Sequence, residues 1–293
     1  MDFSSIQDID FQILQWFNGS NNVILDQLVM ALTSGFTWIP LYLVLFIIVM
    51  RNNETIGQIG LIVGCAFLCI LFADGIAEGI IKPLAARWRP SNDPLVKYSV
   101  QVVDNLRLKD YSFCSAHAAN TMAIAVFFSL LVRSRMLTFT LIAWSLVNCW
   151  TRLYLGVHYP LDIVCGMLLG MVVGTLVYLF FHRMYRRMSP EIKYVSNQYT
   201  STGYDCDDID MIMTVLMLTL VYVILRAVVL LDLYTAVLLR GHQDQILTAA
   251  AGDIFHQILL VLLLQNGGQG AVLIGVHRQI VVILGSGVAH HQL

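Results

Sequence analysis

The stretch IGQIGLIVGCAFLCILFADGIAEGII, residues Ile56–Ile81, decides the fold class of this chain. It exceeds the roughly 20 apolar residues that an α-helix needs to cross the hydrocarbon core of a bilayer. Its only charged residues, Asp74 and Glu78, lie near its C-terminal end. A helix on the surface of a soluble protein needs a polar face toward water, and this stretch has none. It therefore predicts a transmembrane helix.

The composition of the whole chain supports the same conclusion. Hydrophobic residues make up 58% of the 293 positions and charged residues 12%, whereas soluble domains contain about 45–50% and about 25%. Mean hydropathy is +0.73, and the net charge of −2 comes without a basic tail. A soluble globule, a disordered chain and a nucleic-acid-binding protein are thereby excluded. We expect an integral membrane protein that crosses the bilayer several times.

Further apolar blocks follow the pattern of membrane spans. Besides Ile56–Ile81, the expected spans are Phe36–Met50 with the amphipathic lead-in Val23–Leu32, Ala118–Val132, Met136–Leu155, Tyr159–Phe181 and Met211–Leu231. Residues Ile6–Phe17 alternate acidic and bulky apolar residues at helical spacing, which favours a helix lying in the membrane interface. We therefore expect an all-α, polytopic membrane bundle with five to six transmembrane helices and an interfacial N-terminal helix.

Changes in composition divide the chain into four expected parts. Residues 1–22 form the interfacial N-terminal segment, and residues 23–188 form the membrane core. Residues 189–210 are polar and typical of a linker, and residues 211–293 form an additional hydrophobic segment. Beyond residue 231 the apolar runs are short and interrupted by Gln and Gly, so they predict no definite span.

Basic residues in the short loops predict the orientation of the bundle. They follow the first, third and fifth spans, at Arg51, Arg133, Arg135, Arg183, Arg186, Arg187 and Lys193. These span ends are expected to be cytoplasmic, which places the N-terminal segment outside. The loop 82–109 is also rich in Lys and Arg but falls on the outer side, so its cations need another explanation.

Three groups of polar residues stand at span ends on the predicted outer side, where ionisable residues are candidates for function. They are Lys82–Pro90, Cys114–His117 and Arg152–Asp162. Lys and Arg side chains supply donors for a tetrahedral oxyanion, and the planar guanidinium matches phosphate. Asp74, Glu78 and Lys82 are spaced four residues apart, and we interpret them as an internal row of ion pairs that holds Lys82.

Predicted helix starts add to this anion site. Ser115 is expected as an N-cap with His117 in the first turn, so that backbone N–H groups face an anion. Pro160 suits a helix first turn, and His158 and Asp162, spaced i and i+4, share a helix face. A carboxylate there can orient the imidazole for attack. Taken singly, a His or Arg at a membrane interface more often only anchors the chain or reaches toward headgroups.

These residues resemble the type 2 phosphatidic acid phosphatase family, relatives of the vanadium haloperoxidases. The family pattern is Lys-x6-Arg-Pro, then Pro-Ser-Gly-His, then Ser-Arg-x5-His-x3-Asp. The matching positions are Lys82, Arg89 and Pro90, then Ser115 and His117, then Arg152, His158 and Asp162. Cys114 and Ala116 replace the Pro and Gly of the second motif, and Thr151 replaces the Ser of the third. The resemblance covers roughly residues 18–187, and three motifs in order are highly specific together.

The resemblance implies a role for each matching residue. The expected phosphate-binding residues are Lys82, Arg89, Ser115 and Arg152. His158 would attack phosphorus and form a phosphohistidine, Asp162 would orient it, and His117 would protonate the leaving oxygen. No metal and no cofactor are expected, because fixed cations neutralise the charge on the transferred group.

Two further expectations concern residues around these motifs. Lys82, Arg87 and Arg89 of the basic outer loop would bind phosphate, and they would not indicate a cytoplasmic location of this loop. Ala116 would be strained at a positive φ but costs nothing in a helix first turn, where we expect it.

The resemblance implies a lipid phosphatase, which we expect in the inner membrane of a bacterium, and the orientation predicted from the basic residues places its site on the extracytoplasmic face. The expected partners are a lipid phosphate and the bilayer, with no nucleic acid. Undecaprenyl diphosphate is favoured as the substrate, and lipid A, phosphatidic acid and phosphatidylglycerol phosphate are alternatives. Cys114 and Ala116 motivate a hypothesis from another class, a lipid-phosphate-binding protein with a degenerate site. A transporter is disfavoured, because no matching pair of broken helices is present.

Overall fold

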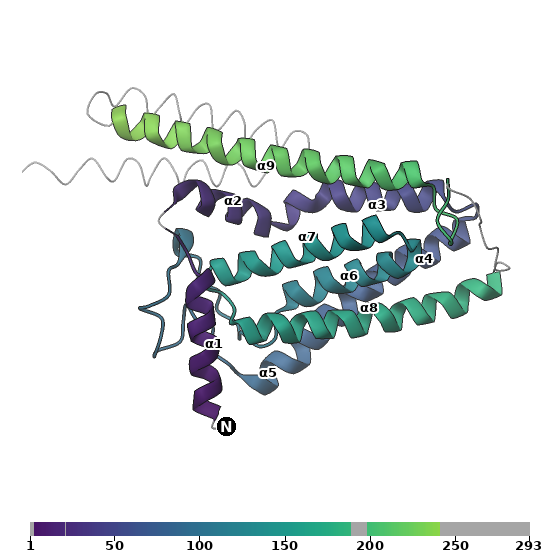
Figure 1. Cartoon of the computed structure of the whole chain (residues 1–293). Helices are drawn as coiled ribbons and strands as arrows, with labels where there is room; N and C mark the ends of the chain where they lie inside the picture. Colours follow the sequence, from purple (N-terminus) through teal and green to yellow (C-terminus); the bar gives the residue numbers. More distant parts are fainter. Residues whose placement is uncertain (1–2, 21, 189–197, 241–293) are drawn as a thin grey trace, which may run out of the picture. The chain divides into compact units, whose positions relative to one another are not determined.

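A computed structural model describes residues 3–20, 22–188 and 198–240 (Figure 1). In chain order, the elements are α1 (Phe3–Phe17), α2 (Val23–Thr33), η1 (Gly35–Trp38), α3 (Ile39–Arg51), α4 (Ile56–Ile76), η2 (Ala77–Ile81), α5 (Lys82–Ala85), η3 (Val103–Asn105), α6 (Ala116–Val132), α7 (Arg135–Tyr154), α8 (Pro160–Met188) and α9 (Cys206–Arg240). Most of the predicted linker, residues 189–197, and most of the predicted C-terminal segment, residues 241–293, lie outside the described residues. The division into four parts therefore stays a prediction.

The described helices confirm an all-α membrane bundle. Those long and apolar enough to cross a membrane are Ile56–Ala85, Pro160–Met188 and Cys206–Leu230. The pair Val23–Thr33 and Gly35–Arg51, bent by 67°, would make a fourth span. α6 is apolar but has 17 residues, and α7 carries Arg135 and Arg152 toward its two ends. The expected number of five to six spans stays a prediction.

Side chains at the starts of the helices explain where several of them begin. The Asn22 side chain accepts hydrogen bonds from the first backbone N–H groups of α2. Thr55 and Gln58 form a reciprocal capping box at the start of α4, and Ser134 caps α7. Each cap satisfies an N–H group that has no partner within its helix.

A π-helical turn interrupts the long helix that leads to the polar end of the bundle. α4 continues through η2 into α5, whose first residue is Lys82. Pro83 has no N–H, and in a regular α-helix its ring would clash with the carbonyl four residues earlier, so the α-helical bonding is interrupted in the turn before it. The wider turn accommodates the proline. It also resets the direction of the side chains that follow, beginning with Lys82.

Glycines of α8 let this helix pack closely against α6. An added Cβ would lie 2.4–2.6 Å from a backbone oxygen of α6 or its N-cap at Gly166, Gly170 and Gly174. Any larger residue would push the helices apart, as is typical of small-residue faces in membrane bundles. Gly60 and Gly64 of α4, which have the same spacing, face open space instead. The close approach places Ser115, next to Gly166, beside the first turns of α8.

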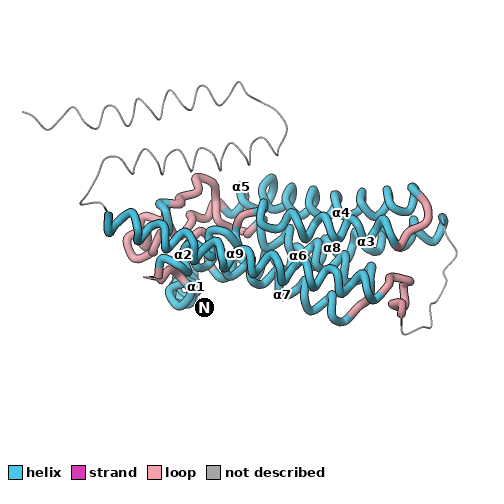
Figure 2. Tube along the Cα trace, turned by 90° about the horizontal axis from the view of Figure 1, so that it is seen from above, coloured by secondary structure: helices cyan, strands magenta, loops and turns pink. Residues whose placement is uncertain are grey.

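The helix α1 runs across the direction of the other helices (Figure 1) and is seen nearly end-on in Figure 2. A helix lying in the membrane interface beside spanning helices has this orientation. The loop 86–115 and the α7–α8 connection lie at the same end of the bundle as α1 (Figure 1). The ends of α3, α6 and α8, which carry the basic residues that predicted orientation, lie at the opposite end.

Candidate active site

The three motif groups come together at the end of the bundle that carries α1. Arg89 joins the first motif to the third: its Nη1 donates to the carbonyl oxygen of Val157 at 2.9 Å and lies 3.1 Å from Nε2 of His158. Arg89, His158 and Lys82 are all buried. Buried cations need an anionic partner, so the groups that face them decide what this site can bind.

One carboxylate, missed by sequence analysis, holds both cations of the first motif. Oδ2 of Asp110 lies 2.6 Å from Nζ of Lys82 and 2.6 Å from Nη2 of Arg89. Although partial burial opposes this, hydrogen bonds from Lys82 and Arg89 hold the pKa of Asp110 well below its usual range. The side chain of Asp110 is 47% exposed. We call Lys82, Arg89 and Asp110 the anion cluster, because a negatively charged group already lies between the two cations.

The expected row of ion pairs is confirmed only in part. Nζ of Lys82 lies 2.5 Å from Oε1 of Glu78, one helical turn earlier. Asp74 instead accepts a hydrogen bond from the Asn120 side chain at 3.0 Å. Lys82 is therefore held between Glu78 and Asp110, and Asp74 belongs to the contact between α4 and α6.

His158 and Asp162 face one another through a serine that sequence analysis also missed. Nδ1 of His158 lies 3.7 Å from Oδ2 of Asp162, beyond hydrogen-bond distance. The Ser112 hydroxyl donates to the same Oδ2 and lies 3.5 Å from Nδ1. The backbone N–H of Tyr159 also donates to Oδ2, at 2.9 Å. These groups fix the carboxylate of Asp162, which is fully buried.

The hydrogen-bond partners of His158 indicate which nitrogen carries its proton. A guanidinium can only donate, so Nε2, which faces Arg89, must accept with its lone pair. The proton then sits on Nδ1, on the side of Ser112 and Asp162. Burial lowers the pKa of His158 to about 4, against the effect of Asp162, and the charge of Arg89 adds to the lowering. The imidazole is therefore neutral near pH 7, and the lone pair of Nε2 is directed at Arg89.

Arg152 approaches the same place from the end of α7. Its Nη1 donates to the Thr33 hydroxyl at 2.7 Å. Its buried Nε has no hydrogen-bond partner among the described residues. Because an unpaired buried donor costs free energy, Nε is suited to an oxygen of a bound ligand.

The second motif opens α6 as the sequence predicted. Ser115 is the N-cap, and its hydroxyl accepts from the N–H of Ala118 at 3.4 Å. Its own N–H donates to the carbonyl oxygen of Asp162 at 3.0 Å, which joins α6 to α8. Ala116 is the first residue of the helix and has no positive φ. The expectation that Ala116 is unstrained in a helix first turn is therefore confirmed.

His117 lies in the first turn of α6 and is exposed. Partial burial and the positive charge of Arg152 lower the pKa of His117 to about 3, so near pH 7 the ring needs the negative charge of a bound anion to hold a proton. The charges of Lys82 and Arg89 add to the lowering. All the residues that the sequence motifs selected are therefore brought to one place, with His117 at its open side.

The expectation that Arg87 serves a phosphate is wrong. Its Nη1 donates to Oδ1 of Asp162 at 2.8 Å, and its Nη2 donates to Oδ2 of Asp10 at 2.6 Å. The guanidinium carbon also stands 3.9 Å from the centre of the Tyr159 ring. Both terminal nitrogens of Arg87 are thus paired with carboxylates. The sequence carried no signal for Asp10, because it is one of two acidic residues on an amphipathic helix.

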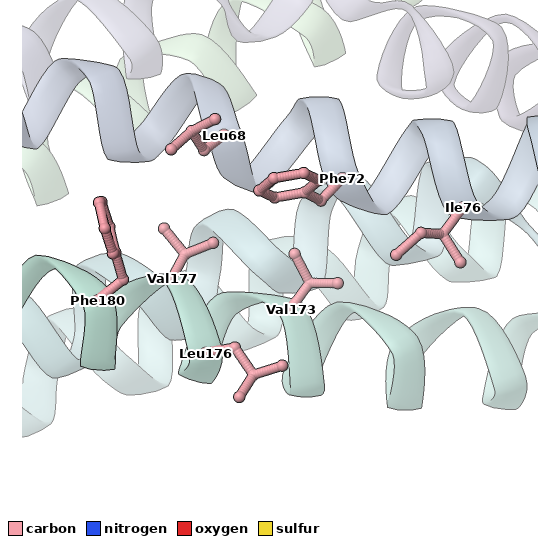
Figure 3. A pocket seen from close by; sticks show the side chains of 7 residues that line it. All are labelled: Leu68, Phe72, Ile76, Val173, Leu176, Val177 and Phe180. Atoms are coloured by element: carbon pink, nitrogen blue, oxygen red, sulfur yellow. The ribbon is translucent and has the colours of Figure 1, made fainter.

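An apolar groove of about 400 Å³ lies between α4 and α8, on the flank of the bundle. Figure 3 shows its walls, which are Leu68, Phe72 and Ile76 from α4 and Val173, Leu176, Val177 and Phe180 from α8. Ile76 precedes Lys82 by six residues, about 9 Å of helix rise. Ile76 therefore marks the end of the groove nearer Lys82.

Sequence comparisons assign the chain to a family. The model of the PAP2 superfamily matches residues 60–186. The chain is 35% identical to a lipid A 4'-phosphatase of Bacteroides thetaiotaomicron over 64% of its own length and 83% of that protein. This chain belongs to the PAP2 superfamily, the family that its motifs resemble. It is an integral membrane protein and a lipid phosphatase.

Two more relatives show how the similarity is distributed. A lipid A 4'-phosphatase of Porphyromonas gingivalis is 30% identical, with 59% of this chain and 73% of that protein covered. An undecaprenyl-diphosphatase of Bacillus subtilis is 27% identical, with 36% of this chain and 53% of that protein covered. The similarity to the two lipid A 4'-phosphatases extends over much more of this chain than the similarity to the undecaprenyl-diphosphatase.

Proposed function

We propose that this protein removes the 4'-phosphate of lipid A. The support is the share of this chain that each relative matches. The lipid A 4'-phosphatases match 64% and 59% of the chain, whereas the undecaprenyl-diphosphatase of Bacillus subtilis matches 36%. The sequence motifs alone favoured undecaprenyl diphosphate, and lipid A was the alternative. Because the motifs are shared by both kinds of enzyme, the remaining sequence is the better guide to the substrate.

One observation carries the proposed chemistry. Nε2 of His158 carries no proton and directs its lone pair at Arg89, and Arg89 and Lys82 together hold a carboxylate. A phosphate bound in place of the Asp110 carboxylate would have its phosphorus facing this nitrogen. Fixed cations around it would stabilise the charge of the transition state without any reorganisation.

The reaction has two steps. In the first, Nε2 of His158 bonds to phosphorus, the bond from phosphorus to the sugar oxygen breaks, and His117 gives its proton to that oxygen. Asp162 and Ser112 stabilise the proton that stays on Nδ1. In the second step, a water gives a proton to His117 while its oxygen bonds to phosphorus. The phosphorus–nitrogen bond breaks, and inorganic phosphate leaves.

The reaction is proposed to need no metal ion. Within residues 3–20, 22–188 and 198–240, no group of three or more His, Cys, Asp or Glu side chains is placed to hold one. Lys82, Arg89 and Arg152 would instead neutralise the phosphate oxygens.

The placement of the site suits a lipid substrate in the outer leaflet of a bacterial inner membrane. Cytoplasmic ends carry an excess of Lys and Arg, and here the ends of α3, α6 and α8 carry such residues away from the site (Figure 1). The site then faces the extracytoplasmic side. An acyl chain would lie in the groove between α4 and α8 while the phosphorylated headgroup enters the anion cluster.

A panel of purified lipid phosphates tests the substrate. The full-length protein in detergent with EDTA should release phosphate from lipid A faster than from undecaprenyl diphosphate, phosphatidic acid or phosphatidylglycerol phosphate. Mass spectrometry of the product should locate the loss at the 4' position. Faster hydrolysis of undecaprenyl diphosphate would replace the proposed substrate, and a requirement for added Mg²⁺ would overturn the metal-free mechanism.

Two histidine variants test the mechanism. His158→Ala should lose activity on every ester, because no nucleophile remains, by a factor of about 10⁴ or more. His117→Ala should lose about 10²-fold less on an aryl phosphate than on the lipid, because an aryl oxide leaves with little help from a proton. His182→Ala, near the other end of α8, is the matched control and should be unaffected. Equal losses for His117→Ala on both substrates would contradict its role as an acid.

A further inference from the structure

The interfacial helix α1 contributes one buried acidic residue to the polar end of the bundle. Asp10 is 5% exposed, whereas Asp8 on the same helix is exposed. An amphipathic helix that merely rests on a membrane surface keeps its charged residues in water. Burial of Asp10 therefore requires a partner that compensates for the lost hydration.

Asp10 has two such partners, one on each carboxylate oxygen. Oδ2 lies 2.6 Å from Nη2 of Arg87, and Oδ1 accepts the backbone N–H of Leu161 at 2.8 Å. Leu161 is the second residue of α8, whose first N–H groups have no partner within the helix. A single side chain of α1 thus holds both the loop that carries Arg87 and the start of the helix that carries Asp162.

Arg87 transmits this contact to the buried carboxylate that orients His158. Its Nη1 lies 2.8 Å from Oδ1 of Asp162, while Oδ2 of the same carboxylate faces Ser112 and His158. The Tyr159 ring packs against the guanidinium at 3.9 Å and limits its movement. With one oxygen held by Arg87, the other oxygen stays directed at the imidazole.

We propose that Asp10 and Arg87 are positioning residues of this active site, through which the interfacial helix α1 holds Asp162 in the orientation that His158 requires. This inference rests on the proposed role of His158 as the nucleophile. Asp10, Arg87 and Asp162 form what we call the positioning cluster. Neither Asp10 nor Arg87 touches the phosphate, so they act on the rate of the chemical step rather than on binding.

The test compares isosteric variants of the full-length protein in one detergent. Asp10→Asn should lower kcat about tenfold and Arg87→Gln about 10²-fold, with KM changed less than about twofold. Asp8→Asn, two residues away on the same helix, should equal wild type. Asp10→Glu keeps the charge and should recover part of the loss. Asp10→Asn with no effect on kcat, or with its effect entirely on KM, would overturn the proposal.

A double-mutant cycle separates positioning from general loss of folding. If Asp10 acts through Asp162, then adding Asp10→Asn to Asp162→Asn should reduce kcat no further than about twofold. Fully additive losses would overturn the proposal. Arg87→Gln leaves a buried carboxylate without its cation, and where this variant does not fold, Asp10→Asn and the cycle decide.

His158→Ala distinguishes failure of this inference from failure of the proposed function. An active His158→Ala protein would overturn the proposed mechanism itself. An inactive His158→Ala protein together with a fully active Asp10→Asn protein would overturn only the role of the positioning cluster.

Discussion

Arg87 and Arg89 stand two residues apart in one loop, yet Arg87 pairs with buried carboxylates and Arg89 with an exposed one. Arg89 pairs with Asp110, whose side chain is 47% exposed. Arg87 pairs with Asp10 and Asp162, whose side chains are 6% and 0% exposed. Nearly equal distances, 2.6 to 2.8 Å, therefore join ion pairs in very different surroundings.

The difference shows which ion pair a ligand can replace. An exposed carboxylate returns to water at little cost, so a phosphate can take its place on Arg89 and Lys82. Separating a buried pair leaves an uncompensated charge and costs about 3–5 kcal/mol. We therefore expect the anion cluster to exchange its carboxylate for substrate and the positioning cluster to keep its ion pairs. Three measurements test this contrast.

The largest expected difference lies in the binding of vanadate, a phosphate analogue. Arg89→Gln should weaken inhibition by vanadate about 10²-fold, because a buried positive charge beside the anion and its charge-assisted hydrogen bond are lost. Arg87→Gln should leave the inhibition constant within about twofold of wild type, although its kcat falls. The measurement is the vanadate inhibition constant of each variant with one lipid substrate. Similar weakening in both variants would show that Arg87 also binds the anion.

A smaller effect, in the opposite direction, is expected at Asp110. Asp110→Asn should strengthen inhibition by inorganic phosphate about tenfold, because no negative side chain competes for Lys82 and Arg89. Asp104→Asn, in the same loop and also exposed, is the control. Because the pKa of Asp110 is held well below its usual range, its carboxylate stays charged in mild acid. The ratio of the two inhibition constants should therefore stay constant between about pH 5 and about pH 8, and unchanged or weaker phosphate binding would contradict this role of Asp110.

The smallest effect concerns the pH dependence of kcat/KM, which His158 should control. This residue lies between Arg89 of the anion cluster and Asp162 of the positioning cluster. The proposed attack by His158 needs the neutral imidazole, and burial lowers the pKa of His158 to about 4. Its protonated, inactive form therefore accumulates only as the pH falls toward that value. On an aryl phosphate, which needs little help from His117, kcat/KM should fall less than about twofold between about pH 7.5 and about pH 5.5, whereas an ordinary histidine at position 158 would cause about a tenfold fall. Phosphorus NMR titration of the substrate corrects for its own ionisation, and a midpoint near 6.5 would contradict the buried, neutral imidazole.

Local sequence signals were sufficient for the helices and for the motif residues. The apolar run Ile56–Ile81 became α4 with η2, and Ser115 and Pro160 begin α6 and α8 as expected. These features depend on neighbours within a few positions, such as a cap or the spacing of apolar side chains. The three motifs also selected the residues that converge, since each spacing belongs to one helix end or one loop.

Tertiary structure alone decided how the charges are paired. Asp110 lies 28 residues from Lys82, Arg87 lies 75 residues from Asp162, and Asp10 lies 151 residues from Leu161. No periodicity links such positions, because their contacts arise only when helix packing brings distant segments together. The sequence by itself determined a membrane bundle and the residue types that suit phosphate chemistry. The packing of α1, α6 and α8 decided which cation belongs to the anion cluster and which one holds the carboxylate of Asp162, because a buried charge must pair with whatever opposite charge the fold places beside it.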